Sequence, residues 1–202
     1  MSVTGTRAQA GEPRPMRADA QRNYARLLEA ASGAFAEHGA DDVSLEEIAR
    51  RAGVGIGTLY RHFPTRQALL EAVYIDQVES LSARARELLR AESPADALAE
   101  WLRAMMKFSS TKRNMTTALL ATLGTDSELL SSCAKEIKGA AESLIARAQQ
   151  AGVVRPDADA KDVIRLVHAV NIATEKTPDP GQADRMLALI LDGLRPQPDA
   201  SG

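Results

Sequence analysis

Residues 45–63 constrain the fold more than any other part of the chain, because two short amphipathic segments lie there on either side of a tight turn. The first segment starts at Leu45, and the turn has the sequence AGVG at 52–55. This spacing predicts a helix-turn-helix. The second helix is too short to bury much surface, which favours a place in a DNA groove over a place in a core. It carries four side chains suited to such contacts: Thr58, Tyr60, Arg61 and His62.

The rest of the chain follows the helical period, and no alternating pattern typical of strands appears. We therefore expect an all-α protein with about nine helices. They are expected to start at 45 and 56 in the helix-turn-helix and to cover 21–38, 65–90, 94–111, 115–123, 126–150, 159–174 and 179–194 elsewhere. Ser44 and Glu47 have the spacing of a capping box, in which each side chain bonds the backbone amide of the other residue. Gly39 and Gly152 follow helical segments and are expected to end them.

Both ends of the chain have a different composition from its centre. Residues 1–18 mix Gly, Pro and Arg without a period, and residues 196–202 read PQPDASG. Neither segment can offset its ordering entropy by burying apolar surface. We expect disordered tails at 1–18 and 196–202.

Composition also limits the class of protein. Among 202 residues there is one cysteine, Cys133, so no intramolecular disulfide can form, and charges interrupt the N-terminus and every long apolar run. A cytoplasmic protein is expected. The net charge of −2 argues against a general binder of polyanions. No Cys/His cluster has the spacing of metal ligands and no glycine-rich loop follows a strand, so we expect no metal, no cofactor and no enzyme activity.

Several segments between residues 22 and 70 form a recognisable pattern: LLEAA at 27–31, Phe35, Gly39, Ile48-Ala49, AGV at 52–54 and GTLYRHF at 57–63. Through these segments, residues 22–70 resemble the TetR family of bacterial transcriptional regulators. The resemblance implies a DNA-binding domain with the helix-turn-helix at 19–66 and a helical ligand-binding and dimerisation domain at 67–195.

The resemblance also implies the DNA contacts. Side chains that hold phosphates would be Ser44, Thr58, Tyr60 and His62, together with Arg66, where the family usually has Lys. Residues at base edges would be Ile56, Gly57 and Arg61. Chemistry agrees in part, since Gly57 lets the backbone approach closely, Ile56 suits a thymine methyl and Arg61 suits guanine. Leu59 and Phe63 lie on the face expected in the core.

Apolar side chains at helical spacing in the second domain suggest a pocket, although each of them also suits plain core packing. The candidate pocket residues are Trp101, Met105, Phe108, Met115, Leu119, Leu123 and Ile137. His168 and Asn171 lie three apart on an apolar helix and either aim inward at a ligand or form an exposed or interface pair.

A single helix-turn-helix reads few base pairs, so two copies must be held about 34–36 Å apart on DNA. A homodimer is therefore expected. The last two helices, where the resemblance places a dimer bundle, supply the candidate interface. Its residues are Val163, Val167, Val170, Met186, Leu187, Ile190, Leu191 and Leu194.

We expect a ligand-responsive DNA-binding transcriptional regulator, a repressor that a small, mostly apolar effector releases from operator DNA. Two alternatives stay open. The first is a helical ligand-binding or adaptor protein without operator binding, which would have no need to keep Thr58, Tyr60 and Arg61 together. The second is an enzyme in the C-terminal bundle, which would need two converging ionisable groups.

Overall fold

The computed structural model describes residues 14–40, 42–124, 126–175, 177, 179 and 181–196, and these residues contain eight helices and no strand. The expected all-α class is confirmed. The helices are α1 (Arg14–His38), α2 (Leu45–Arg51), α3 (Ile56–His62), α4 (Arg66–Leu88), α5 (Pro94–Leu123), α6 (Glu128–Gln150), α7 (Ala160–Thr174) and α8 (Gln182–Gly193). Residues 14–18 of the predicted N-terminal tail are therefore helical, while residues 1–13 and 197–202 of the two tails lie outside the described residues.

Capping side chains explain where several helices begin. The Thr65 hydroxyl accepts from the Ala68 amide at 3.0 Å, the Ser93 hydroxyl from the Asp96 amide at 3.2 Å, and the Asp159 carboxylate from the Lys161 amide at 2.7 Å. Each bond satisfies one of the amides that a helix start leaves without an intrahelical partner. Because these bonds are local, the predicted starts of α4, α5 and α7 agree with the structure to within about two residues.

Three predicted boundaries differ from the structure. Segments 94–111 and 115–123 join into the single helix α5, because the polar run at 109–114 contains no Gly or Pro and buried Met115 and Leu119 continue its buried face. The helix predicted from 126 begins at Glu128, because the Ser127 hydroxyl caps α6 by accepting from the Leu130 amide at 3.4 Å. The helix predicted from 179 begins at Gln182.

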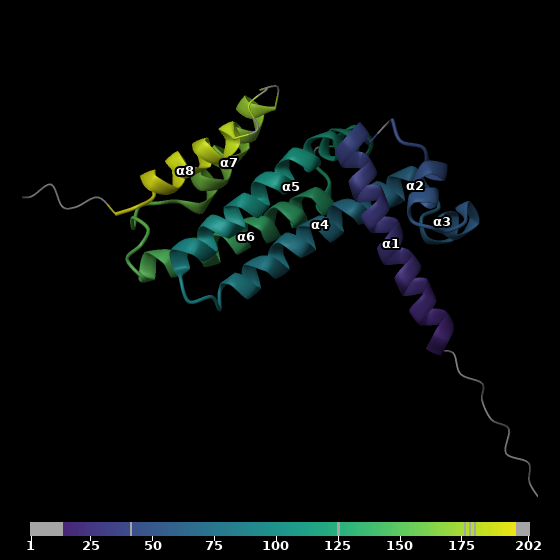
Figure 1. Ribbon diagram of the computed structural model, residues 1–202, viewed down its shortest axis with the longest axis horizontal. Coiled ribbons are helices and arrows are strands. Elements are labelled where there is room, and N and C mark those ends of the chain that lie inside the picture. The colour runs from purple at the N-terminus through teal and green to yellow at the C-terminus, as the bar shows by residue number, and fades with distance from the viewer. Residues whose placement is uncertain are drawn as a thin grey trace, which may run out of the picture.

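The helices form two lobes joined by α4 (Figure 1). One lobe contains α1, α2 and α3, and we call it the reading head; the other contains α5 to α8, with α7 and α8 side by side at its outer edge. Phe35, Ile48 and Leu59 are fully buried in the head, and Trp101 and Leu102 in the second lobe. The buried residues of both lobes form one continuous hydrophobic cluster through α4. The two lobes therefore share one close-packed core that includes buried residues of α4.

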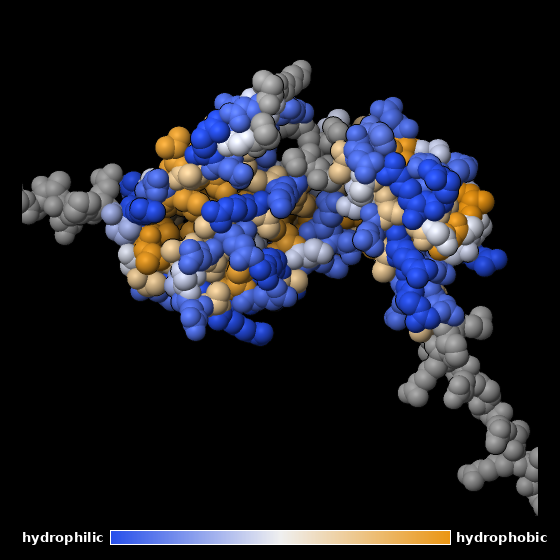
Figure 2. Space-filling model, viewed as in Figure 1, coloured by the Kyte–Doolittle hydropathy of each residue, from blue (hydrophilic) through white to orange (hydrophobic). Residues whose placement is uncertain are grey.

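Apolar surface is distributed unevenly over the molecule. In the view of Figure 2, more of it is open on the lobe of α4 to α8 than on the reading head, whose surface is mostly hydrophilic. Across the described ranges, no helix combines the length and the apolar character that crossing a bilayer requires.

Candidate nucleic-acid interface

The turn between α2 and α3 sets their crossing. Gly53 has a φ of 66°, a left-handed conformation that favours glycine. The next amide, that of Val54, bonds back to the Ala49 carbonyl at 3.0 Å and closes the end of α2. Gly55 then precedes α3 without a side-chain cap. The predicted helix-turn-helix is present, and its turn depends on one glycine conformation.

The recognition helix α3 has a buried face and an open face. Leu59 and Phe63 are buried in the head at 0% and 2% exposure, as predicted from their helical positions. Tyr60 is 46% exposed, Ile56 is 37% exposed, and Arg61 is also exposed. Gly57 is exposed, and Thr58 and His62 are half-buried at the edge between the two faces. The open face therefore presents one cation, one phenol and one aliphatic side chain to solvent.

His62 is held in place by aromatic neighbours. Its ring meets that of Tyr24 edge to face at a centroid distance of 5.8 Å, and the Tyr24 ring lies 5.1 Å from that of Phe63. Such contacts restrict the rotamers of the imidazole and of Tyr24. Sequence reasoning missed Tyr24, because its partners on α3 are almost forty residues away and no local pattern connects them.

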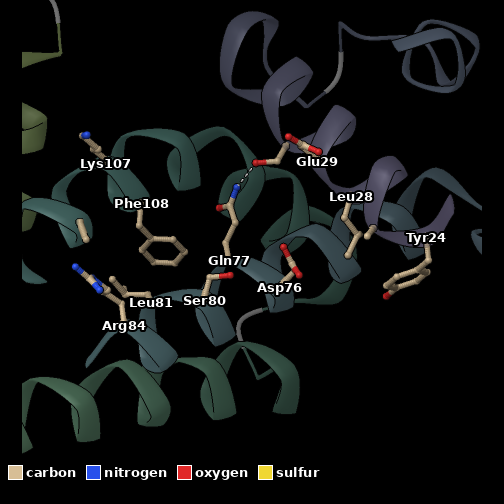
Figure 3. Close-up of a pocket in the computed structure, with 13 residues that line it drawn as sticks. Tyr24, Leu28, Glu29, Asp76, Gln77, Ser80, Leu81, Arg84, Lys107 and Phe108 are labelled. Carbon is tan, nitrogen blue, oxygen red and sulfur yellow. Dashed lines mark hydrogen bonds between the residues drawn. The ribbon is translucent and has the colours of Figure 1, made fainter. Parts of the chain in front are cut away.

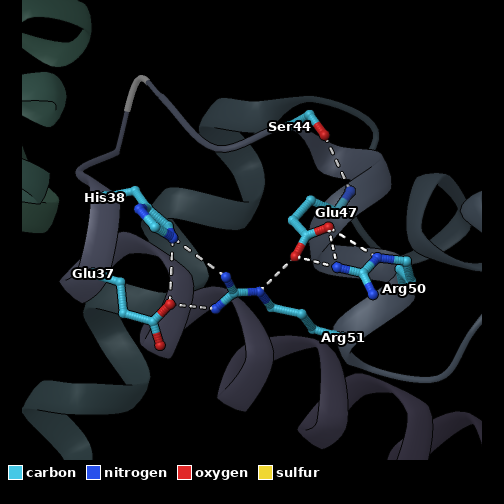
Figure 4. Close-up of polar contacts among 6 residues, drawn as sticks. All are labelled: Glu37, His38, Ser44, Glu47, Arg50 and Arg51. Atoms are coloured by element: carbon cyan, nitrogen blue, oxygen red, sulfur yellow. Dashed lines mark hydrogen bonds and ion pairs between the residues drawn. The ribbon is translucent and has the colours of Figure 1, made fainter.

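Charged side chains fasten the end of α1 to α2 (Figure 4). The Ser44 hydroxyl accepts from the Glu47 amide at 3.1 Å, as expected of a cap. The Glu47 carboxylate does not reach back to Ser44, which corrects half of the predicted capping box; it accepts from Arg50 at 2.7 Å and from Arg51 at 2.8 Å. Arg51 also donates to Glu37 at 2.7 Å. The hydrogen bonds from Arg51 lower the pKa of both carboxyls and raise the pKa of Arg51.

This network predicts a pH dependence of stability. Because Glu37 and Glu47 have a pKa below the ordinary 4.5 only when folded, they stabilise the fold above about that pH, and the contribution disappears as the pH falls through the lowered values. Arg51→Met should lower the melting temperature at about pH 7, and this deficit should shrink progressively as the pH falls below about 4.5, measured by circular dichroism. Arg90→Met is the control, since exposed Arg90 forms no ion pair among the described residues. An Arg51→Met deficit that persists undiminished at acid pH would contradict the account.

Arg66, predicted to hold a phosphate, is turned toward the protein. Its guanidinium donates to the Ala40 carbonyl at 2.7 Å and to the Val43 carbonyl, both in the connection between α1 and α2. The side chain is half-buried. Arginine suits this place because its planar fork reaches two acceptors at once. The first residue of α4 thus fastens the second lobe to the loop that precedes Ser44.

Replacing Arg66 separates the two roles. If Arg66 fastens the loop, Arg66→Lys should lower the free energy of unfolding by about 1–2 kcal/mol, because a lysine cannot bond both carbonyls. Arg66→Gln should leave the slope of log affinity for DNA against log salt unchanged. A phosphate contact would instead lower that slope by about 0.9 per chain. Urea unfolding and a salt series of DNA titrations measure the two quantities.

The structure brings six of the nine candidate pocket residues together as buried side chains of the second lobe: Trp101, Met105, Phe108, Met115, Leu119 and Ile137. Leu123 and Asn171 are half-buried and His168 is exposed. The Trp101 indole donates to the Leu81 carbonyl on α4 at 3.1 Å. This bond ties α5 to α4 and gives Trp101 a structural role.

Polar groups lie within the same interior. Tyr74 on α4 is 2% exposed and its ring is 6.3 Å from that of Phe108; burial raises its pKa to about 12. The hydroxyl oxygens of Ser82 on α4 and Ser109 on α5 are buried and have no hydrogen-bond partner among the residues that the structure describes. A buried hydroxyl without a partner costs about 1–3 kcal/mol and requires an explanation.

Five of the eight candidate interface residues face the interior of their own chain. Val163, Val167, Val170 and Leu187 are at most 4% exposed, and Leu194 is 8% exposed. A side chain buried within one chain has little surface left for a partner, so these five residues belong to the core of the single chain. The half-buried members are Met186, Ile190 and Leu191. The exposed apolar side chains on these helices are Leu166, Ile172 and Leu189.

A helix-turn-helix with an open recognition helix, joined through a long helix to a second helical lobe, defines the class of DNA-binding transcriptional regulators. Residues 27–73 match the family model described as bacterial regulatory proteins of the tetR family, and residues 93–196 match that of the SbtR-like transcriptional regulator C-terminal domain.

Known proteins agree with these matches. The chain is 26% identical to the HTH-type transcriptional regulator UidR of Escherichia coli K12 over 75% of this chain and 79% of that protein. It is similar to the TetR transcriptional regulator SCO0520 from Streptomyces coelicolor, with a TM-score of 0.78 and 37% identity over 86% of this chain and 99% of that one. A TetR regulatory protein from Mycobacterium vanbaalenii gives a TM-score of 0.73 and 39% identity over 90% and 100% of the two chains. The chain therefore belongs to the TetR family of bacterial transcriptional regulators, which bind DNA and are not enzymes.

Proposed function

We propose that a homodimer of this chain binds operator DNA through two copies of α3 and represses transcription until a small, mostly apolar effector releases it. The observation that carries the proposal is the open face of α3, where Tyr60 and Arg61 are exposed while Leu59 is fully buried. Neither exposed side chain serves the core, and both suit DNA. Because a repressor must bind chromosomal DNA, the proposed location of the protein is the bacterial cytoplasm.

The contacts divide by chemistry. Hydroxyl and imidazole groups at the start of α2 and along α3 bind phosphates, and Arg61 reads guanine with its two-pronged donor. Ile56 meets a thymine methyl beside Gly57. The phosphate ligands in this proposal are Ser44, Thr58, Tyr60 and His62.

Gly57 offers a test in which stability and DNA binding should change in opposite directions. A Cβ at this position would meet nothing within 4 Å, so nothing inside the protein requires a glycine. Gly57→Ala should stabilise the fold by up to about 1 kcal/mol, because alanine is the better helix former. The same methyl should obstruct the approach of α3 to the groove and weaken operator binding about tenfold or more. Thermal unfolding and DNA titration give the two readings, and unweakened DNA binding would contradict the proposed contact.

Dimerisation requires a surface that is open on the single chain. Leu166 and Ile172 on α7 and Leu189 on α8 are 49%, 64% and 71% exposed, which is unusual for large apolar side chains on adjoining helices. Pairing of these helices with a second copy would remove the three side chains from water. It would also fix the distance between the two reading heads, which an operator with two half-sites requires.

The effector site in this proposal lies in the second lobe, between α4 and the helices that pack on it. The partnerless hydroxyls of Ser82 and Ser109 supply polar contacts for a mostly apolar molecule. Because α4 also fastens the reading head through Arg66, a shift of α4 changes the separation of the two heads. By linkage, the effector must bind the DNA-free state more tightly than the DNA-bound state. A coupling of about 1–3 kcal/mol would weaken operator binding roughly five- to 150-fold.

The repressor role is tested with a reporter gene behind a promoter that contains a selected operator. Expression of this chain should lower the reporter signal, and a variant that folds but lacks Arg61 should not. An unchanged signal, or an increase with the wild-type chain, would contradict repression.

A further inference from the structure

A cavity lies at the junction of the reading head with the second lobe, outside the interior proposed as the effector site. Its volume is about 690 Å³, and its walls come from α1, α4 and the middle of α5. We call it the junction cleft. This volume falls in the range of small-molecule sites. Of the candidate pocket residues, only Phe108 lines it.

The chemistry of the junction cleft is uneven (Figure 3). Leu28, Leu81 and Phe108 are buried apolar side chains in its walls. Glu29 on α1 and Asp76 on α4 lie on the same side of Gln77 in the close-up, and Phe108 and Arg84 lie on the other side. The cleft therefore has an acidic part next to the head, and a part deeper in the second lobe where Leu81 and Phe108 lie with Arg84 and Lys107 beside them.

Charged side chains of both signs line the junction cleft: the carboxylates of Glu29 and Asp76 and the cations of Arg84 and Lys107. Arg84 is held by Glu87 at 2.7 Å and by Glu100. Glu29 and Asp76 are exposed, and neither has an ion-pair partner among the described residues. Lys107 lies in the cleft on the same side of Gln77 as Phe108 and Arg84. The two carboxylates on the other side of Gln77 favour a cationic group at that end of the cleft.

Gln77 adds a hydrogen-bonding group that can adapt to a ligand. Its Nε2 donates to the Ser32 hydroxyl at 2.7 Å and so joins α4 to α1, while its Oε1 is buried without a partner. Rotation of the terminal amide exchanges the two atoms, so the side chain can present an acceptor toward the cleft. An ammonium group supplies the donors that this oxygen lacks.

We propose that the junction cleft binds small molecules that carry an amine beside an apolar body, and that the bound molecule fixes the reading head relative to the second lobe. The amine lies near Glu29 and Asp76, and the apolar body lies against Leu81 and Phe108. Because α1 of the head and α5 of the second lobe both line the cleft, a swing of the head changes its shape, so a ligand favours one orientation of the head. This second part rests on the proposed function, whereas the binding itself does not.

Dansylcadaverine, a primary amine with an apolar fluorescent body, is the probe. Titrated into the protein without DNA, it should bind saturably below about 1 mM. Its neutral N-acetyl derivative should bind at least about fivefold more weakly. Absence of saturation would overturn the site, and equal binding of the neutral derivative would overturn the role of the carboxylates.

Variants locate the bound probe. Glu29→Gln and Asp76→Asn should each weaken binding about threefold to tenfold, while Glu79→Gln, which removes an exposed charge from α4 outside the cleft, should not. Ser80→Trp should abolish binding by filling the cleft, with circular dichroism to verify that it folds. Unaltered binding in all of these variants would place the probe elsewhere and overturn the proposal.

A second titration tests the effect on the head. With operator DNA present, dansylcadaverine should change DNA affinity at least about fivefold in the wild type and leave it unchanged in Ser80→Trp. If the probe binds but DNA affinity does not change, the proposed effect on the orientation of the reading head is wrong, whereas the proposed binding site is still supported. Failure to bind any operator would be a failure of the proposed function, and the titration without DNA would still decide the cleft.

Discussion

Arg61→Ala should lower operator affinity roughly 30-fold to more than 10⁴-fold, because each dimer loses two bidentate contacts of about 1–3 kcal/mol. The variant should lose base discrimination at one base pair in each half-site. Substitution of that base pair should weaken binding by the wild-type protein and should not change binding by the variant. Stability should hardly change, since Arg61 is exposed and has no ion-pair partner among the described residues.

Two further variants control this experiment. Arg61→Lys keeps the positive charge but lacks the two parallel N–H donors of the guanidinium. It should therefore also lose base discrimination, while weakening DNA binding less than Arg61→Ala does. Tyr60→Phe removes only a hydroxyl and should weaken binding to all sequences equally, as loss of a phosphate contact does. If Arg61→Ala weakens binding uniformly across every substituted operator, Arg61 holds a phosphate and the assignment of the base contact is wrong.

Leu189→Glu should convert a dimer into single chains and lower operator affinity by about 10³-fold or more. A charge at this 71% exposed position cannot be buried in a partner's apolar surface without a large desolvation cost. A single head then reads only a half-site and binds DNA little better than non-specifically. Sedimentation velocity measures the mass, and anisotropy measures the affinity. Leu166→Glu should act in the same way.

Leu120→Glu is the matched control for the dimer variants. Leu120 is also an exposed leucine, at 40%, but it lies on α5, away from α7 and α8 in the chain. It should leave both the mass and the affinity unchanged. A Leu189→Glu protein that sediments with the mass of two chains would show that another surface makes the dimer.

The sequence predicted those features of the fold that depend on neighbouring residues. Ser44, Thr65 and Ser93 cap helices through bonds to an amide three residues ahead, which a linear pattern can show. The buried positions of Leu59 and Phe63 followed from helical spacing. Family resemblance and periodicity agreed on the reading head, and the family matches support a DNA-binding regulator over an adaptor or an enzyme.

What the sequence did not predict depends on distant partners. The acceptors of Arg66 lie 23 and 26 residues away, and the network through Glu37 and Arg51 spans 14 residues. Long side chains choose such partners only after the helices pack. On α7, both Val167 and Leu166 are apolar, and periodicity cannot tell which face covers the core and which stays open.

Operator binding is tested by fluorescence anisotropy of the purified protein with DNA from upstream of its own gene, beside a scrambled duplex and across a salt series. We expect two chains to bind the upstream duplex at least about 10³-fold more tightly than the scrambled duplex. Equal, weak and steeply salt-dependent binding of both duplexes, together with no preferred sequence in a selection from random DNA, would contradict this expectation.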